Sequence, residues 1–249
     1  MRKLVASLAC RNNGSRLYGK PMQNLDIKSG FSVLDYIIAS TKKYSGVAET
    51  VLGISEGKDN ECFIDVAEKH AIPYIIGNET DVLKRLIQCC EAVGGTDIFR
   101  VTTESPFMYF EAIEKAWQQH AEGNYDFSML DHMPDGSGIE IIKLDAYKYS
   151  WANGEERHRN ELCSLFIREN KEKFRIREIE APKEVKRMDI RLTIDYPEDL
   201  ILCRAIYQRF KEKAPLIPLA DIIQFLDQNP KLKELVQPFV EEGLQTMYI

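Results

Sequence analysis

The sequence lacks the features that mark several common protein classes. Its six cysteines form no C-x-x-C pair and show no zinc-ligand spacing, and its four histidines show no ligand spacing either. No run approaches the roughly eighteen apolar residues of a membrane span. The apolar run near the first residue is too short for a signal peptide. We therefore expect a cytoplasmic protein, away from membranes, whose reduced cysteines serve as small hydrophobic side chains.

A surplus of positive charge is also missing. Lys and Arg total 33 against 39 Asp and Glu, and the resulting net charge of −6 argues against a general nucleic-acid binder. Internal repeats and low-complexity linkers are absent from the sequence as well. The 249 residues, 44% of them hydrophobic, are enough to bury a large core, so we expect a single domain over residues 1–249.

The first 120 residues alternate between short apolar runs and longer amphipathic segments. Short apolar runs bounded by polar residues predict buried strands, and segments with an apolar stripe predict helices. This alternation predicts an α/β fold with a mainly parallel central sheet and helices on both faces. The predicted strands are residues 3–9, 49–55, 72–77 and 97–102, and the predicted helices are residues 31–44, 58–71, 79–94 and 110–123.

The pattern changes after residue 125. Strand-like runs now dominate, with one strong helix-like segment between them, and we expect residues 125–170 to form a small mixed subdomain. The alternative is that this segment folds back onto the chain's own sheet. The predicted strands here are residues 126–130, 138–144, 173–180 and 189–195, and the predicted helices are residues 157–170, 197–213, 219–229 and 231–243.

A polar loop with three cations follows the first predicted strand. Arg11, Arg16 and Lys20 all lie in "RNNGSRLYGK", together with Gly14 and Gly19. Ligands bind at the carboxyl ends of parallel strands, where glycine-rich turns offer N–H groups and Arg or Lys adds charge for phosphate. The loop matches neither the Walker motif nor G-x-G-x-x-G. The loop is therefore either a phosphate-binding site or a solvated basic loop.

This loop carries a resemblance to a known family. It is similar to the opening motif A-R-x-x-S-x-R-L-P-G-K of the sugar-activating cytidylyltransferases, the group that contains CMP-Kdo and CMP-sialic acid synthetases. The spore-coat-polysaccharide cytidylyltransferase-like branch is the most similar. Arg11, Arg16, Gly19 and Lys20 are in register, whereas Gly14 stands at the family's serine. Tyr18 likewise replaces its proline.

Further motifs follow in the same order over about residues 3 to 205. "DVLKR" and "RVTTESP" resemble D-V-L-x-R and R-x-T-x-D-x-P, with Glu104 where the family has Asp. "RNELCSLFI" resembles R-E-H-V-T-P-Y-I, with Leu162 in place of the histidine. "PDGSGIEII" and "RLTIDYPEDL" resemble the G-x-x-x-E segment and the closing T-x-D-x-P-E-D-L. The resulting candidate site residues are Arg85, Arg100, Thr102, Glu104, Glu140, Glu161 and Asp195.

The resemblance implies a fold, a reaction and a role for each of these residues. The fold is Rossmann-like, as in nucleotide-diphospho-sugar transferases. The reaction transfers CMP from CTP to a sugar or sugar-like acceptor with release of pyrophosphate, for surface-polysaccharide or glycoconjugate biosynthesis. It uses Mg²⁺ or Mn²⁺ and a homodimer in which residues 125–170 contact the partner and the acceptor. The implied roles are catalytic for Lys20 and Arg16, nucleotide-binding for Arg11, Gly14, Ser15, Gly19, Arg85, Arg100 and Thr102, acceptor-binding for Glu140 and Glu161, and metal-binding for Asp195 and Glu104.

Several alternatives stay open. Asp195 also suits an N-cap of the helix that follows it, Arg85 suits an i,i+4 pair with Asp81, and Glu104 suits a surface loop. The protein could be a catalytically weak nucleotide binder, use another nucleoside triphosphate, or take a small phosphorylated acceptor that is not a sugar. A glycosyltransferase is a third class, but the sequence has no D-x-D metal motif.

Overall fold

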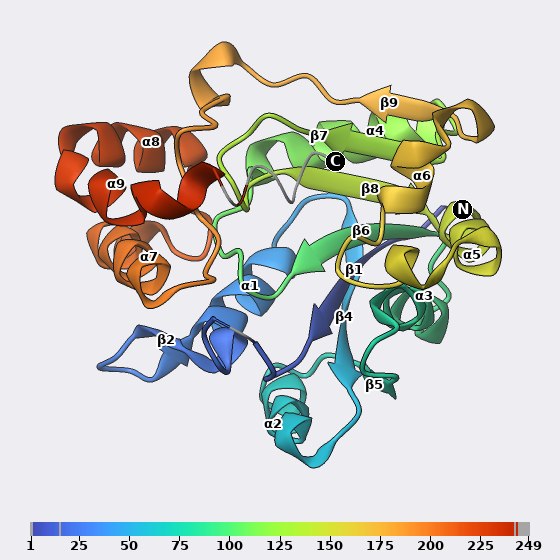
Figure 1. Ribbon diagram of the computed structural model, residues 1–249, viewed down its shortest axis with the longest axis horizontal. Helices are drawn as coiled ribbons and strands as arrows, with labels where there is room; N and C mark the ends of the chain where they lie inside the picture. Colours follow the sequence, from blue (N-terminus) through green and yellow to red (C-terminus); the bar gives the residue numbers. More distant parts are fainter. Residues whose placement is uncertain (1, 15, 242, 244–249) are drawn as a thin grey trace.

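A seven-stranded sheet forms the centre of the protein. The computed structural model describes residues 2–14, 16–241 and 243. The strand order is β5-β4-β1-β6-β8-β7-β9, and all neighbours are parallel except where β8 runs antiparallel to β6 and β7 (Figure 1). The strands are β1 (Leu4–Cys10), β4 (Val47–Ser55), β5 (Tyr74–Gly77), β6 (Asp97–Thr102), β7 (Phe127–Leu130), β8 (Ile139–Lys143) and β9 (Ile176–Glu178).

Helices cover both faces of this sheet, as the sequence predicts. Strand β1 is buried along its length, and its alternate side chains enter two separate cores. Leu4 and Leu8 pack with α1, α2, α4, α7 and α8, whereas Val5 packs with α3 and α5. The helices are α1 (Val33–Thr41), α2 (Cys62–Lys69), α3 (Val82–Ala92), α4 (Ile113–Glu122), α5 (Leu144–Asn153), α6 (Leu165–Glu169), α7 (Pro197–Arg209), α8 (Leu219–Gln228) and α9 (Pro230–Val236).

The register of the sheet brings two loops together. Ala9 of β1 lies beside Thr102 of β6, and Cys10 lies beside Ile54 of β4. Because these strands are parallel, the loop after β1 and the loop after β6 leave the same edge as neighbours. That edge is where a ligand is expected in an α/β sheet.

The segment 125–170 contributes β7 and β8 to the main sheet. Their apolar side chains, including Phe127, Ile141 and Ile142, are buried in the two cores of the same chain. The strands of this segment therefore extend the central sheet. Its predicted roles in acceptor binding and in a dimer stay predictions.

The strand predicted at 189–195 is wrong, and the helix predicted at 157–170 is too long. Residues 189–195 form no strand, because their backbone bonds go to loops: Leu192 N–H donates to the Asp135 carbonyl and Ile194 N–H to that of Glu104. Helix 157–170 shrinks to α6, because the Asn160 side chain accepts the Leu162 N–H and interrupts the turn. Helix α5 was not predicted at all. Its aromatic residues "YKYSW" are more typical of strands.

The C-terminal helices form a group beside the ligand edge of the sheet, drawn in orange and red in Figure 1. Helix α7 holds a short hairpin, β2 (Asn24–Asp26) with β3 (Phe31–Ser32), through a bond from Arg204 to the Asn24 carbonyl. The predicted helix 231–243 breaks after α9 into a 3₁₀ turn, Gln237–Phe239, at Pro238. A proline has no N–H to continue the α-helical ladder.

A buried Ser–His–Asp chain connects α4 to the sheet. His120 Nδ1 lies 2.7 Å from Ser128 Oγ, and His120 Nε2 lies 3.2 Å from Asp97 Oδ1. All three side chains are fully buried, and Arg2 pairs with the same aspartate. Because no substrate can reach this serine, the chain is structural: it satisfies polar groups under α4.

Candidate functional site

The cation loop after β1 folds back on itself. Asn12 is buried, and its backbone forms hydrogen bonds on two sides. Its N–H donates to Asn60 Oδ1 at 2.8 Å, and its carbonyl accepts the Gly19 N–H at 2.9 Å. Gly19 has φ +63°, which favours glycine. A Cβ on Gly14 would lie 2.6 Å from the Leu17 carbonyl oxygen, so the family's serine does not fit there without moving the loop. Ser15 lies outside the described residues.

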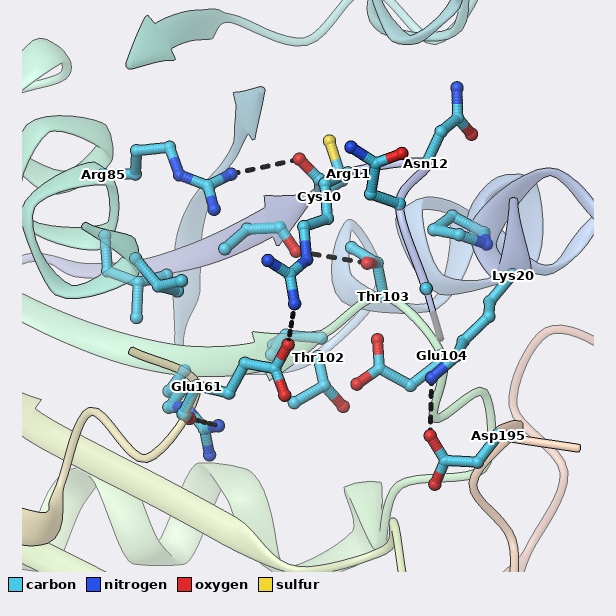
Figure 2. Close-up of a pocket in the computed structure, with 18 of the residues that line it drawn as sticks. Cys10, Arg11, Asn12, Lys20, Arg85, Thr102, Thr103, Glu104, Glu161 and Asp195 are labelled. Atoms are coloured by element: carbon cyan, nitrogen blue, oxygen red, sulfur yellow. Dashed lines mark hydrogen bonds and ion pairs between the residues drawn. The ribbon is translucent and has the colours of Figure 1, made fainter. Parts of the chain in front are cut away.

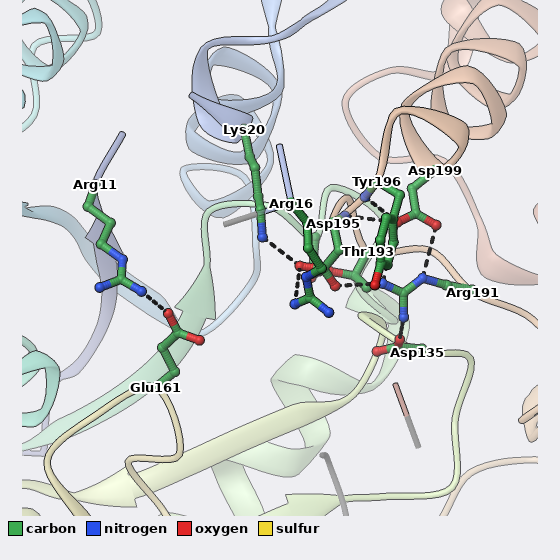
Figure 3. A network of polar contacts seen from close by, with 11 residues as sticks. Arg11, Arg16, Lys20, Asp135, Glu161, Arg191, Thr193, Asp195, Tyr196 and Asp199 are labelled. Carbon is green, nitrogen blue, oxygen red and sulfur yellow. Dashed lines mark hydrogen bonds and ion pairs between the residues drawn. The ribbon is translucent and has the colours of Figure 1, made fainter. Parts of the chain in front are cut away.

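Two of the loop's cations meet one carboxylate. Lys20 Nζ lies 2.5 Å and Arg16 Nη2 3.1 Å from Asp195 Oδ1 (Figure 3). These three residues, predicted from motifs at opposite ends of the chain, come together at the carboxyl edge of the sheet. Asp195 is not an N-cap: the Asp199 carboxylate takes the backbone N–H groups of Asp195 and Tyr196 at the start of α7.

A buried arginine holds Asp195 from its other side. The Arg191 side chain is 1% exposed, and its guanidinium reaches Asp195 Oδ2 at 2.5 Å, Asp135 at 2.5 Å and Asp199 at 2.9 Å (Figure 3). The sequence analysis missed Arg191 and Asp135. An arginine inside an apolar alternation was the available signal, because a buried arginine requires anionic partners.

The environment shifts the acids of this group in different directions. Burial opposes ionisation of Asp195, but Lys20, Arg191 and Arg16 lower its pKa overall. Burial raises the pKa of Asp135 to about 6, although Arg191 opposes this shift. The anionic form of Asp195 is therefore strongly stabilised by its three cationic neighbours.

Glu104 lies beside Lys20 and Asp195, as Figure 2 shows. Burial raises the pKa of Glu104, and the negative charges of Asp195 and Glu161 add to the effect, against Lys20. Within the described chain its carboxylate receives no hydrogen bond or ion pair. The described residues contain no group of three or more His, Cys, Asp or Glu that could hold a metal ion.

Two carboxylates nonetheless fit one kind of metal site. Mg²⁺ is commonly bound by one or two carboxylates together with phosphate oxygens and waters. Glu104 and Asp195 supply such oxygen donors at the wall of a cavity, and the raised pKa of Glu104 shows an acid that an added cation would stabilise. The pair therefore fits Mg²⁺ held jointly with a polyphosphate.

A second ion network lines the other side of the site. Arg100 Nη1 lies 2.9 Å from Glu140, and Arg168 binds both Glu140 at 3.0 Å and Asp131 at 2.7 Å. Burial would raise the pKa of Glu140, but Arg100 and Arg168 lower it to about 2. An arginine in a largely buried strand needs an anionic partner, and for Arg100 this partner is Glu140.

The remaining predicted residues border the same space. Arg11 forms an ion pair with Glu161, and Arg100 donates to the Glu161 carbonyl at 2.7 Å (Figure 2). Arg85 is 1% exposed and does not pair with Asp81. It donates instead to the carbonyl oxygens of Cys10 and Gly53, both at 3.0 Å. Arg85 therefore fastens α3 to the ends of β1 and β4.

These residues surround a cleft with two compartments. The smaller, about 140 Å³, lies against the cation loop, and the larger, about 630 Å³, extends toward β7 and β8. A cavity of the larger size accommodates a small organic ligand. Both compartments are lined by Arg11, Arg16, Val82, Arg100, Thr102, Glu104, Glu161 and Asp195, whereas Lys20, Gly14 and Arg85 line only the smaller and Glu140 only the larger.

Comparison with known proteins identifies the relatives of this chain. The family model described as cytidylyltransferase matches residues 8–236. The spore coat polysaccharide biosynthesis protein SpsF of Bacillus subtilis is 26% identical over 235 residues, which are 92% of this chain and 96% of SpsF. An uncharacterized protein of Methanocaldococcus jannaschii, MJ1063, is 25% identical over 94% of each chain.

Solved structures share the fold. A cytidylyltransferase from Leptospira borgpetersenii superposes with a TM-score of 0.83 at 20% identity, over 93% of this chain and 97% of the other. A CMP-2-keto-3-deoxy-manno-octonic acid synthetase in complex with CTP superposes with a TM-score of 0.63 at 15% identity, over 83% and 99%. Among the described residues, none of the helices is both long and apolar enough to cross a membrane.

Proposed function

We propose that the protein, which belongs to the sugar-activating cytidylyltransferase family, transfers CMP from CTP to a sugar-like acceptor and releases pyrophosphate. Because the protein belongs to this family, it is a nucleotidyltransferase. CTP as the donor is supported by the CTP complex of the structurally similar synthetase. A role in polysaccharide or glycoconjugate biosynthesis is supported by the named function of SpsF.

The observation that carries this proposal is the meeting of Lys20, Arg16 and Asp195. Two cations and a carboxylate converge at the ligand edge of the sheet, where both compartments of the cleft join. Lys gives a mobile point charge and Arg a planar fork, and both suit phosphate oxygens. We assign the triphosphate to the smaller compartment and the acceptor to the larger.

The reaction needs positioning more than covalent help from the protein. An acceptor oxygen bonds to the α-phosphorus, the bond from that phosphorus to the β-phosphate oxygen breaks, and the acceptor's proton is lost to solvent. Lys20 and Arg16 hold the triphosphate and offset charge that develops on the leaving pyrophosphate. Asp195 and Glu104 would hold Mg²⁺, which neutralises phosphate oxygens when bound.

A pyrophosphate-release assay tests the proposal. The protein is incubated with Mg²⁺, each of the four nucleoside triphosphates, and acceptors of three kinds: a keto-sugar acid, a sugar 1-phosphate and a small phosphorylated metabolite. We expect release with CTP and an acceptor, with a CMP-linked product by mass spectrometry. A clear preference for another nucleotide would reassign the donor, and the absence of pyrophosphate with every pair would refute transfer.

A catalytically weak nucleotide binder is the second candidate. Glu104 carries one methylene more than the aspartate usual at this position, and Asp195 is already engaged by three cations. Tight binding of CTP without turnover in the same assay would favour this function.

We also propose a homodimer, from the family resemblance. Because most apolar side chains of residues 125–170 are buried in the chain's own cores, the contact between subunits would use exposed residues of this segment, such as Tyr149. Light scattering at micromolar concentration tests it. A mass that stays at 28.7 kDa on concentration would rule the dimer out.

A further inference from the structure

The chain continues past the family-matched region and returns to the site. The match ends at residue 236, and the described residues that follow are 237–241 and 243, here called the C-terminal segment. Phe239, in the 3₁₀ turn of this segment, stacks on Tyr196 with ring centroids 4.0 Å apart and planes 14° apart. This is the closest of the aromatic ring pairs among the described residues.

Tyr196 in turn contacts a catalytic candidate. The Arg16 guanidinium carbon lies 5.2 Å from the centroid of the Tyr196 ring, within the range of a cation–π contact. The same guanidinium lies 3.1 Å from Asp195. Tyr196 follows Asp195 directly in the chain, so a ring and a carboxylate of adjacent residues both contact the Arg16 guanidinium.

The C-terminal segment also approaches the rear of the site. A Cβ placed on Gly243 would lie 2.5 Å from Arg191 Nη1 and 2.6 Å from Asp135 Oδ2. Gly243 is one of the residues that line the larger compartment. Segment and site therefore touch at two independent places, once through Phe239 and once through Gly243.

We propose that Phe239 and Tyr196 are positioning residues for Arg16, and that the C-terminal segment is a working part of the site. A stacked aromatic pair has few rotamers, so it holds its ring plane with little loss of entropy on binding. The guanidinium over that plane then keeps one orientation toward the phosphate. The inference rests on the proposed function only in placing a triphosphate beside Lys20 and Arg16.

Titration calorimetry with inorganic tripolyphosphate and Mg²⁺ tests this inference on the full chain. Tripolyphosphate carries neither base nor acceptor, so the result is independent of which nucleotide is used and of whether turnover occurs. We expect Phe239→Leu, which keeps apolar bulk but loses the flat stack, to weaken binding roughly two- to tenfold. We expect Phe239→Tyr to stay within about twofold of the parent, since the ring is kept.

Two comparisons separate positioning from a general loss of stability. Phe225 is also half-buried against the same core. Among the described residues its ring makes an edge contact with Phe210 and no stacked one, so Phe225→Leu should leave binding unchanged. In an Arg16→Ala background, Phe239→Leu should have no further effect on binding. If Phe239→Leu does not fold, Tyr196→Leu takes its place with the same expectations. Parent-like binding by a folded Phe239→Leu, or an equal loss without Arg16, would overturn the inference.

Discussion

Asp195 Oδ2 lies 2.5 Å from Arg191 Nη2, while Asp195 Oδ1 faces Lys20 and Arg16. One carboxylate therefore links a buried cation to the two exposed to the cleft. A triphosphate that binds Lys20 and Arg16 competes with Asp195 for the same N–H groups. Under the proposed function, nucleotide binding at this site would exchange one anion for another.

This exchange predicts opposite effects of Asp195→Asn on binding and on turnover. Without its negative charge, residue 195 competes less with phosphate for Lys20 and Arg16, so metal-free CTP should bind several-fold tighter. Turnover should fall by about 10²-fold or more, which is the loss expected when one group that stabilises the transition state is removed. Calorimetry without Mg²⁺ and pyrophosphate release with Mg²⁺ measure the two effects. Looser metal-free binding would contradict the exchange.

Removing either cleft cation should abolish turnover and spare the fold. Lys20→Ala and Arg16→Ala each remove charge from the phosphate compartment, and both side chains are partly exposed, so little packing is lost. We expect kcat/KM to fall by about 10²-fold or more with a parent-like melting temperature. Lys28→Ala, in the hairpin turn, is a matched surface control. Near-parent kcat/KM in either variant would indicate that the loop is a solvated basic loop and does not bind phosphate.

Arg191→Met should destabilise the protein strongly. It leaves Asp135, Asp195 and Asp199 without the buried cation that they share, and such a break costs about 3–5 kcal/mol. Arg187, which pairs with Asp189 and Asp227 near the surface, gives the control: Arg187→Met should cost no more than about 1 kcal/mol. Urea unfolding measures both. Equal losses in the two variants would show that burial of Arg191 is unimportant.

His120 should make the fold less stable in mild acid. Burial lowers the pKa of His120, although Asp97 opposes the shift. Below its unfolded value of about 6.5, the unfolded chain takes up a proton more readily than the folded chain, so the free energy of unfolding falls as pH falls. His120→Gln should flatten this dependence between about pH 7 and 5.5. Urea unfolding over this pH range measures the dependence, and an unchanged slope in His120→Gln would contradict the prediction.

Glu104 offers a test of metal dependence. If it holds Mg²⁺ with Asp195, EDTA should stop pyrophosphate release and added Mg²⁺ or Mn²⁺ should restore it. Glu104→Gln should then raise the Mg²⁺ concentration needed for half-maximal rate, and Glu104→Asp, the residue usual in the family, should keep the requirement near that of the parent. An unchanged metal requirement in Glu104→Gln would assign Glu104 another role.

The sequence was enough to predict the sheet and its covering helices in the first half. There, the pattern of each element is simple: β1 is a short run that is apolar except for Ser7, and α3 has a clear apolar stripe. The strand predicted at 189–195 is wrong because Ile190, Leu192 and Ile194 are buried in alternation, as in a strand, while their backbone hydrogen bonds go to loops. The pattern of apolar residues reflects which side chains are buried, and it does not show where the backbone hydrogen bonds go.

The site was predicted less completely than the fold. Motifs indicated Lys20, Arg16 and Asp195, and the structure brings them together. Local pattern could not reveal Arg191 with Asp135, because their pairing spans 56 residues and depends on tertiary packing. Nor could it indicate Phe239, which meets Tyr196 only after three further helices have packed.

The reversed strand β8 divides the cleft into parts that can change separately. Because β8 runs against β7, the turn between them, residues 131–138, lies at the same edge as the cation loop. That turn lines the larger compartment, and no residue of it lines the smaller. Exchanges in this turn that keep Asp135, the partner of Arg191, would reshape the larger compartment and leave Lys20 and Arg16 in place. If the larger compartment binds the acceptor, as we propose, proteins of this fold could differ in acceptor and keep the same donor.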